Sequence, residues 1–144
     1  MKSLMCKLAI LIAIAVPGMS HAWFEPQRGT QLRSDLMNTI RPQAEAELGA
    51  PVQFVVESLR VDGSVAFAAL QPQRPGGVQI LWEETQMAAR GEDPMGYNGS
   101  VIHAIFAFGG ASWDVIAWTI GAGEVWWSDP QICATHGTLT PEVC

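Results

Sequence analysis

The chain has almost no lysine. Its two lysines, Lys2 and Lys7, stand close to the N-terminus, and none follows in the 144-residue sequence. A lysine nucleophile or a lysine Schiff base is therefore excluded for any domain that begins after them. Lysine and arginine together number 8 against 14 acidic residues, and loss of the two lysines changes the formal charge from −6 to −8. An acidic chain without a basic cluster is a poor candidate for binding nucleic acids or anionic membranes, because both bind chiefly through neutralised phosphates, and we expect no nucleic-acid partner.

Long apolar runs are absent after the first residues. The run LAILIAIAV at 8–16 follows the two lysines, and the small residues of Ser20-His21-Ala22 suit a signal peptidase. This pattern predicts a secretory signal peptide at 1–22 and one exported domain at 23–144, in the bacterial periplasm or outside the cell. No later run approaches the roughly 18 apolar residues of a spanning helix. We therefore expect no membrane insertion once the signal is cleaved.

Cysteine is scarce, with three residues in the chain. Cys6 lies ahead of the apolar run, which leaves Cys133 and Cys144 in the exported domain. An even number of cysteines in an exported protein predicts a disulfide, and closing so short a loop contributes about 3 kcal/mol in the loop-entropy model. The alternative is a metal site that includes His136, but the pair lacks the CxxC spacing typical of zinc ligands. We predict a disulfide, no metal and no cofactor.

Signatures of catalysis are also missing. After the predicted signal the histidines are His103 and His136; there is no GxSxG motif, and no glycine-rich loop is followed by a lysine. These absences disfavour a serine hydrolase and a phosphate-binding loop, and we assign no catalytic residue. One enzymatic alternative stays open, a cell-wall-directed hydrolase that uses Asp114 or Glu84 as its acid. It requires an acid and His103 to meet in one concave pocket.

One amphipathic helix is expected after the signal. Apolar residues recur at every fourth position from Leu32 to Leu48, which predicts a helix that packs on one side. Thr30 suits the N-cap, and Gly49 suits the residue that ends the helix. Pro42 lies inside this segment and predicts either a kink or a division into two shorter helices.

Strand-length runs rich in β-branched and aromatic residues make up much of the remaining chain. They lie at 52–61, 65–70, 78–82, 101–108 and 113–120, and we expect a short strand or an extended arm at 124–127. Asp62-Gly63 and Gly109-Gly110 predict the turns of two hairpins. The pattern predicts an α+β domain, in which an N-terminal helix packs on an antiparallel sheet of four or five strands. The disulfide closes the C-terminal tail.

The hairpin at 101–120 is apolar on both faces. Strict alternation places one set of side chains on each face of its two strands: Val101, His103, Ile105 and Ala107 against Ile102, Ala104, Phe106 and Phe108, and Trp113, Val115 and Ala117 against Ile116, Trp118 and Ile120. A single helix can cover only one face. We expect the second face to be covered by the C-terminal arm with Trp126 and Trp127, by a second copy of the chain, or by a ligand or protein partner.

An arginine in the loop QPQRPGG is one candidate for binding. Arg74 is held between prolines and glycines near Trp82, where it could bind an anion or stack on the indole ring. The alternative is a structural role, in which Arg74 staples the loop through Glu83 or Glu84.

Tryptophan is the other concentrated feature. We expect Trp118 in the core, and one of Trp126 and Trp127 buried with the other partly exposed. His103 is expected to be a core or interface histidine rather than a base. The full set of candidate binding residues is Arg74, Trp82, His103, Trp113, Asp114, Trp126 and Trp127.

Two long strings, LRSDLMNTIRPQAEAELGAPVQFVVESLRVDGSVAFAALQPQRPGG and VIHAIFAFGGASWDVIAWTIGAGEVWW, resemble a family of small exported bacterial domains without an assigned function. The shared features are a leading helix with an Arg-Pro step, a PVxFxV strand, a PQRPGG loop and a closing GG.W.V hairpin, over most of residues 32–127. The resemblance implies the α+β architecture and gives no residue a role.

The sequence therefore predicts a non-enzymatic binding or interaction domain of the bacterial envelope. An inhibitor or immunity-type protein is one version of it. The expected partner is a protein, a peptide or a second copy of the chain, bound through the second face or an edge of the sheet. The alternatives are the hydrolase described above and a purely structural homodimer.

Overall fold

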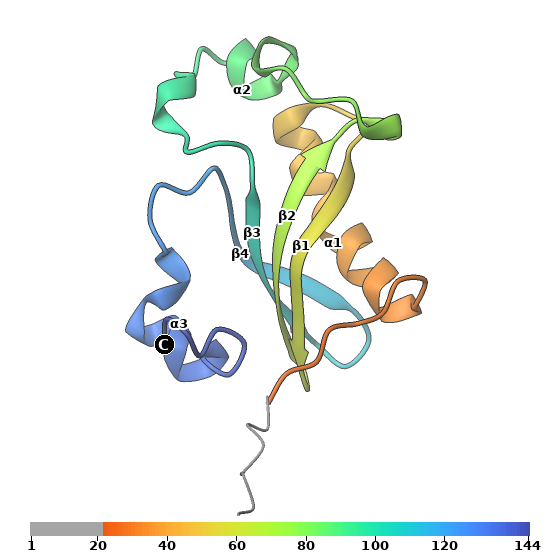
Figure 1. The fold of residues 1–144 in the computed structure, drawn as a ribbon, viewed down its shortest axis with the longest axis vertical. Coiled ribbons are helices and arrows are strands. Elements are labelled where there is room, and N and C mark those ends of the chain that lie inside the picture. Colours follow the sequence, from red (N-terminus) through yellow and green to blue (C-terminus); the bar gives the residue numbers. More distant parts are fainter. Residues whose placement is uncertain (1–21) are drawn as a thin grey trace, which may run out of the picture.

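The computed structural model describes residues 22–144 (Figure 1); the predicted signal peptide lies outside this part except for its last residue. A helix packs on one face of a four-stranded antiparallel sheet with the order β1-β2-β3-β4, which confirms the α+β prediction. The main elements are α1 (Gln31–Leu48), β1 (Gln53–Asp62), β2 (Val65–Gln73), β3 (Ile102–Phe108) and β4 (Trp113–Ile120). Two shorter helices, α2 (Gln86–Ala89) and α3 (Pro130–His136), lie in the long loop before β3 and in the tail.

Helix α1 begins and ends at the predicted residues. The Thr30 hydroxyl oxygen accepts a hydrogen bond from the Arg33 N–H at 3.4 Å, and the Gly49 N–H donates to the Glu45 carbonyl at 2.9 Å. Gly49 has φ of 79°, a conformation that glycine adopts without strain. Pro42 lies inside one continuous helix, so the division into two helices is wrong. The helix tolerates the lost backbone hydrogen bond because its apolar stripe is buried in the core.

The first hairpin forms where it was predicted, with its turn displaced by one residue. Asp62 pairs with Val65, so Gly63 and Ser64 form the turn, and Gly63 has φ of 56°. The predicted strand at 78–82 is wrong. Val78 makes a single bridge to Arg74, and the chain then continues into a 3₁₀ turn at Trp82–Glu84. This segment crosses the end of the sheet because the second edge of β2 is already paired with β3.

A bulge at Ile116 changes which residues of β4 face the helix. Ala117 pairs with Ile105 and Val115 with Phe106, so Ile116 is an extra residue and stays 51% exposed. The prediction of strict alternation is wrong for this strand. Four other apolar side chains of β4 pack against the helix-side core: Trp113, Val115, Trp118 and Ile120.

The C-terminal tail covers the second face of the sheet. A 3₁₀ turn at Trp126–Ser128 and helix α3 replace the predicted strand or arm, and the Cys133–Cys144 disulfide is present. Figure 1 shows α3 and the C-terminus on the side of the sheet opposite α1. The buried residues of this second core are Phe67, Ala69, Ile105 and Leu139. Trp126 and Trp127 are both half-buried, so neither is the fully buried member of the predicted pair.

Replacing Gly121 with alanine should destabilise the domain strongly. Gly121 has φ of 57°, and a Cβ there would lie 2.4 Å from the Gly99 carbonyl oxygen. We expect Gly121→Ala to lower the free energy of unfolding by about 2–3 kcal/mol. Gly123, which has open space around it, supplies the matched control, and Gly123→Ala should have little effect. Urea unfolding of the oxidised protein measures both, and equal midpoints for the two variants would contradict the packing described here.

Candidate functional site

The predicted binding residues lie in separate places. Trp113 lies at the turn end of the second hairpin, Trp82 in the long loop before β3, and Arg74 near the end of α1. His103 lies on the second face with Trp126 and Trp127. The structure therefore does not bring the predicted set together into one site.

Arg74 has the structural role. Its Nη2 donates to the Leu48 carbonyl at 2.9 Å, and its Nη1 donates to the carbonyls of Pro51 at 3.1 Å and of Gly49. These carbonyls lie at the end of α1, where backbone acceptors lack helical partners. Arg74 thus joins the end of β2 to the end of α1, and its partners are backbone carbonyls rather than the predicted Glu83 or Glu84.

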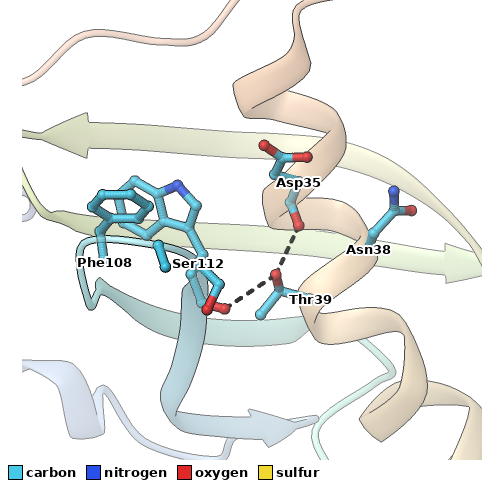
Figure 2. Close-up of a pocket in the computed structure, with 7 residues that line it drawn as sticks. Asp35, Asn38, Thr39, Phe108 and Ser112 are labelled. Atoms are coloured by element: carbon cyan, nitrogen blue, oxygen red, sulfur yellow. Dashed lines mark hydrogen bonds between the residues drawn. The ribbon is translucent and has the colours of Figure 1, made fainter.

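Trp113 and Trp82 line two different cavities. The cavity beside Trp113, of about 350 Å³, lies between α1 and the second hairpin. Figure 2 shows Asp35, Asn38 and Thr39 of α1 across it from Phe108 and Ser112. The Thr39 hydroxyl donates to the Asp35 carbonyl within α1 at 2.8 Å, and a longer contact of 3.5 Å joins it to the Trp113 carbonyl of β4.

The cavity beside Trp82 is smaller, about 240 Å³, and mostly apolar. The rings of Trp82 and Tyr97 lie 5.3 Å apart, and the Tyr97 hydroxyl donates to Glu92. The rest of the lining combines apolar residues (Leu48, Pro72, Ile80, Met87 and Ile120) with polar ones (Gln79, Thr85 and Ser100). This cavity offers packing surface, with few polar groups that converge on a point.

An aromatic cluster holds the tail against the second face. The His103 ring stacks on Trp127 with 4.1 Å between centroids, and Trp127 also contacts Phe67 at 5.6 Å. The Trp126 indole N–H donates to the Thr119 hydroxyl at 2.8 Å. Burial lowers the pKa of His103, and Glu57 opposes this effect. The imidazole is therefore neutral near neutral pH, and its contribution is to packing.

The geometry that the hydrolase requires is not formed by the predicted acids. Glu57, and not Asp114 or Glu84, is the carboxylate that influences the pKa of His103. Asp114 and Glu84 are both exposed. Within residues 22–144 no three His, Cys, Asp or Glu side chains group so as to hold a metal ion, and no helix is long and apolar enough to cross a membrane. The hydrolase stays a prediction without a geometric argument in its favour.

A groove that the sequence reading missed runs beside the edge strand β1. It consists of a cavity of about 360 Å³ between β1 and the first half of α1, and an adjoining cavity of about 410 Å³ over the first half of α1 itself. Both cavities are lined by Gly29, Arg33 and Met37. Arg28 and residues 54–56 complete the lining of the smaller cavity, and Arg41 contributes to the larger one. Both linings contain arginines, and neither contains a carboxylate.

The outer edge of β1 pairs with another segment at one end. Phe24 and Val61 form an antiparallel bridge in which each N–H donates to the other carbonyl at 2.9 Å. Beyond this bridge, no other strand of residues 22–144 pairs with the outer edge at 53–57. In an antiparallel pair, the backbone N–H and C=O groups of successive residues point alternately toward the partner strand and away from it. The bulge near Glu57 shifts this alternation by one residue, so the backbone groups of Phe54 and Val56 point away from β2. The groove therefore contains an edge with hydrogen-bonding groups available.

The other edge of the sheet is less accessible. Both edge strands carry a bulge, near Glu57 in β1 and at Ile116 in β4, so the bulges do not distinguish the two edges. The Thr39 hydroxyl reaches the Trp113 carbonyl at its start, and the Asn98 N–H donates to the Gly121 carbonyl at 2.8 Å just beyond its end. Of the two edges, β1 is the better candidate site.

The sequence held one signal for this groove. Three of the six arginines that follow the predicted signal peptide stand between residues 28 and 41. Their importance depends on β1 being an edge strand, and strand order within a sheet is not readable from local patterns. The sequence reading therefore emphasised tryptophans, which the structure uses largely for packing.

Comparison with known proteins gave no match. No protein-family model matches the chain, and no curated protein or solved structure matches it. The resemblance to a family of exported bacterial domains stays a prediction.

Replacing His103 with phenylalanine should reduce the sensitivity of folding to acid. The usual pKa of 6.5 applies to the unfolded chain, whereas burial lowers the pKa of His103 in the folded protein. As pH falls from about 7 to about 5, His103 binds more protons in the unfolded chain than in the folded protein. The free energy of unfolding is therefore highest above the unfolded pKa and decreases as pH falls below it. We expect a smaller decrease for His103→Phe over this range.

Chemical denaturation at several pH values measures this difference. Burial also lowers the pKa of His136, so His136→Gln should remove a separate part of the same slope. Parallel curves for the unmodified protein and His103→Phe would contradict the prediction.

Proposed function

We propose that the protein is a small non-enzymatic binding domain of the bacterial envelope, and that it holds an extended segment of a partner protein against the outer edge of β1. The observation that carries the proposal is the Phe24–Val61 bridge beside an unpaired stretch of the same edge. The N-terminal segment already forms the hydrogen bonds of an added strand with this edge, at the single pair Phe24–Val61. The adjoining groove leaves room for a partner to continue the pairing.

The physics of strand addition suits this surface. An extended segment that joins a sheet edge gains affinity from main-chain hydrogen bonds and specificity from alternate side chains. Edge strands of monomeric proteins are commonly protected by charges, prolines or bulges. In β1 the bulge lies near Glu57, and Val55 beside it is an apolar residue that is 45% exposed. An exposed β-branched residue on an open edge supports a role in binding.

The second face of the sheet is a weaker candidate than the edge. The tail already buries Leu139 against Phe67 and Ile105 there, and the His103–Trp127 stack fixes it. A partner on this face would have to displace the tail and its disulfide-closed loop. The cavities beside Trp82 and Trp113 lie between elements of the fold, and the two tryptophans contribute to the packing of those elements.

The proposed location rests on the predicted signal peptide and on the Cys133–Cys144 disulfide, which suits an oxidising compartment. An inhibitor or immunity-type role is one version of the proposal, because such proteins act by occupying a partner's surface. The alternative is a homodimer. The form predicted from the sequence buries an apolar sheet face against a second copy, but the tail occupies that face, so the alternative here is a dimer in which two β1 edges pair across a two-fold axis.

Site-specific photo-cross-linking tests the proposed function. Val55 on β1 and Val125 in the loop before the tail are both valines, with exposures of 45% and 44%. A benzophenone amino acid replaces one or the other, and the oxidised protein is irradiated in the cells that produce it. We expect a defined adduct from Val55 and none above background from Val125.

The attached peptide, identified by mass spectrometry, separates the alternatives. A segment of another envelope protein supports the proposed function. A segment of this chain means that the homodimer is correct. Equal labelling from the two positions, or no adduct at Val55, would overturn binding at the β1 edge.

A further inference from the structure

We infer that the segment bound along β1 is acidic, with carboxylate side chains at every second residue on the side of α1 and apolar side chains between them. The inference rests on the proposed function and specifies the chemistry of its partner. It follows from the charge of the groove, the arrangement of its arginines and the alternation of side chains in a strand.

The charge of the groove is opposite to that of the domain. After the predicted signal, six arginines stand against 14 acidic residues. Arg28 and Arg33 line the cavity beside β1, and Arg33 and Arg41 line the adjoining cavity over α1. Neither lining includes a carboxylate, and the nearest ion pair is that of Arg33 with the exposed Glu25, at 3.4 Å. Acidic residues elsewhere on the surface repel an acidic partner, whereas this groove attracts it. The contrast directs such a partner to one place on the molecule.

Two of these arginines are held in position by the fold. Arg33 uses Nη1 to donate to the Pro26 carbonyl at 2.9 Å and lies 3.4 Å from the Glu25 carboxylate. Arg41 donates from Nη1 to the Val52 carbonyl, and its guanidinium carbon lies 5.2 Å from the centre of the Phe54 ring. A guanidinium has five N–H donors, so one occupied nitrogen leaves others to contact a carboxylate. Such fixed side chains lose little entropy on binding.

The two sides of an added strand meet different surfaces. Phe54 and Val56 pack toward α1, where Arg33 and Arg41 lie. On the opposite side an added strand meets the exposed Val55 and Glu57. Like charges on neighbouring strands repel, so Glu57 disfavours acids on that side, and Val55 favours an apolar residue there. The alternation of acidic and apolar residues follows from these two environments.

Peptide binding tests the inference directly. The probe is a fluorescein-labelled heptapeptide with capped ends, in which glutamate alternates with valine. Its control has glutamine in place of each glutamate. Fluorescence anisotropy with the oxidised protein, purified as the cell processes it, gives the dissociation constants. We expect the glutamate peptide to bind at least about tenfold more tightly than the glutamine peptide, and the difference to shrink as salt is raised.

Matched arginine variants locate the contact. Arg28 lines the groove, whereas Arg90 is exposed elsewhere and pairs with Glu47 and Glu92. Arg28→Gln and Arg90→Gln remove the same formal charge. We expect Arg28→Gln to weaken binding of the glutamate peptide by about threefold or more, and Arg90→Gln to leave it unchanged. Equal effects of the two variants would mean that only net charge matters, which overturns the inference.

N-methylated peptides separate this inference from the proposed function. Two versions of the glutamate peptide carry N-methyl groups on alternate residues, one set on the glutamates and the other on the valines. Since only one set of N–H groups faces β1, we expect one version to bind like the parent and the other to lose at least about tenfold in affinity.

The outcomes then differ for the two claims. If the glutamate and glutamine peptides bind equally while Val55 still cross-links to an envelope protein, the acidic pattern is wrong and the proposed function stands. If acid is required but both methylated versions bind equally, no strand is added, and both claims fail. If no peptide binds, the acidic pattern is overturned, and cross-linking at Val55 decides the proposed function alone.

Discussion

The structure depends on covering a sheet whose central strands are apolar on both faces. Helix α1 covers one face, and the disulfide-closed tail covers the other. The tail is held by the Trp127–His103 stack and by Arg60, whose Nη1 donates to the Leu139 carbonyl at 2.8 Å. With both faces occupied by the chain itself, the edges become the remaining surfaces of the sheet. Of these, β1 alone among the described strands combines an open stretch, a groove and a group of arginines.

Charge and packing have separate roles in this domain. The tryptophans contribute mainly to the two cores and to the contacts that fasten the tail and the long loop. Arginines donate hydrogen bonds to backbone carbonyls at the ends of elements, where these carbonyls lack other partners. Arg74 does so at the end of α1. The same residue type, fixed in the same way by Pro26 and Val52, also lines the groove beside β1. A structural role and a binding role are therefore compatible for one guanidinium, because it carries several donors.

The local features of the fold were readable from sequence, and the long-range ones were not. Thr30, Gly49 and the first hairpin followed from capping and turn chemistry, and the cysteine pair followed from its number and context. Helix α3 carried a readable signal that was overlooked, since Asp129 caps it and Pro130 occupies its first turn. The bulge at Ile116 and the edge position of β1 had no local signal, because both depend on how strands far apart in sequence pair. The candidate site was missed for the same reason.

The order of the two covers along the chain sets an order of assembly. Most of the helix-side core lies between Leu36 and Phe106, and the first hairpin within it joins residues close in sequence. The contacts of the tail come from the last residues of the chain, and they close against strands that must already be paired. A chain whose sheet has paired before the tail closes exposes one apolar face to water. Until Trp127 and Leu139 pack against Phe67 and Ile105, the exposed apolar face favours aggregation.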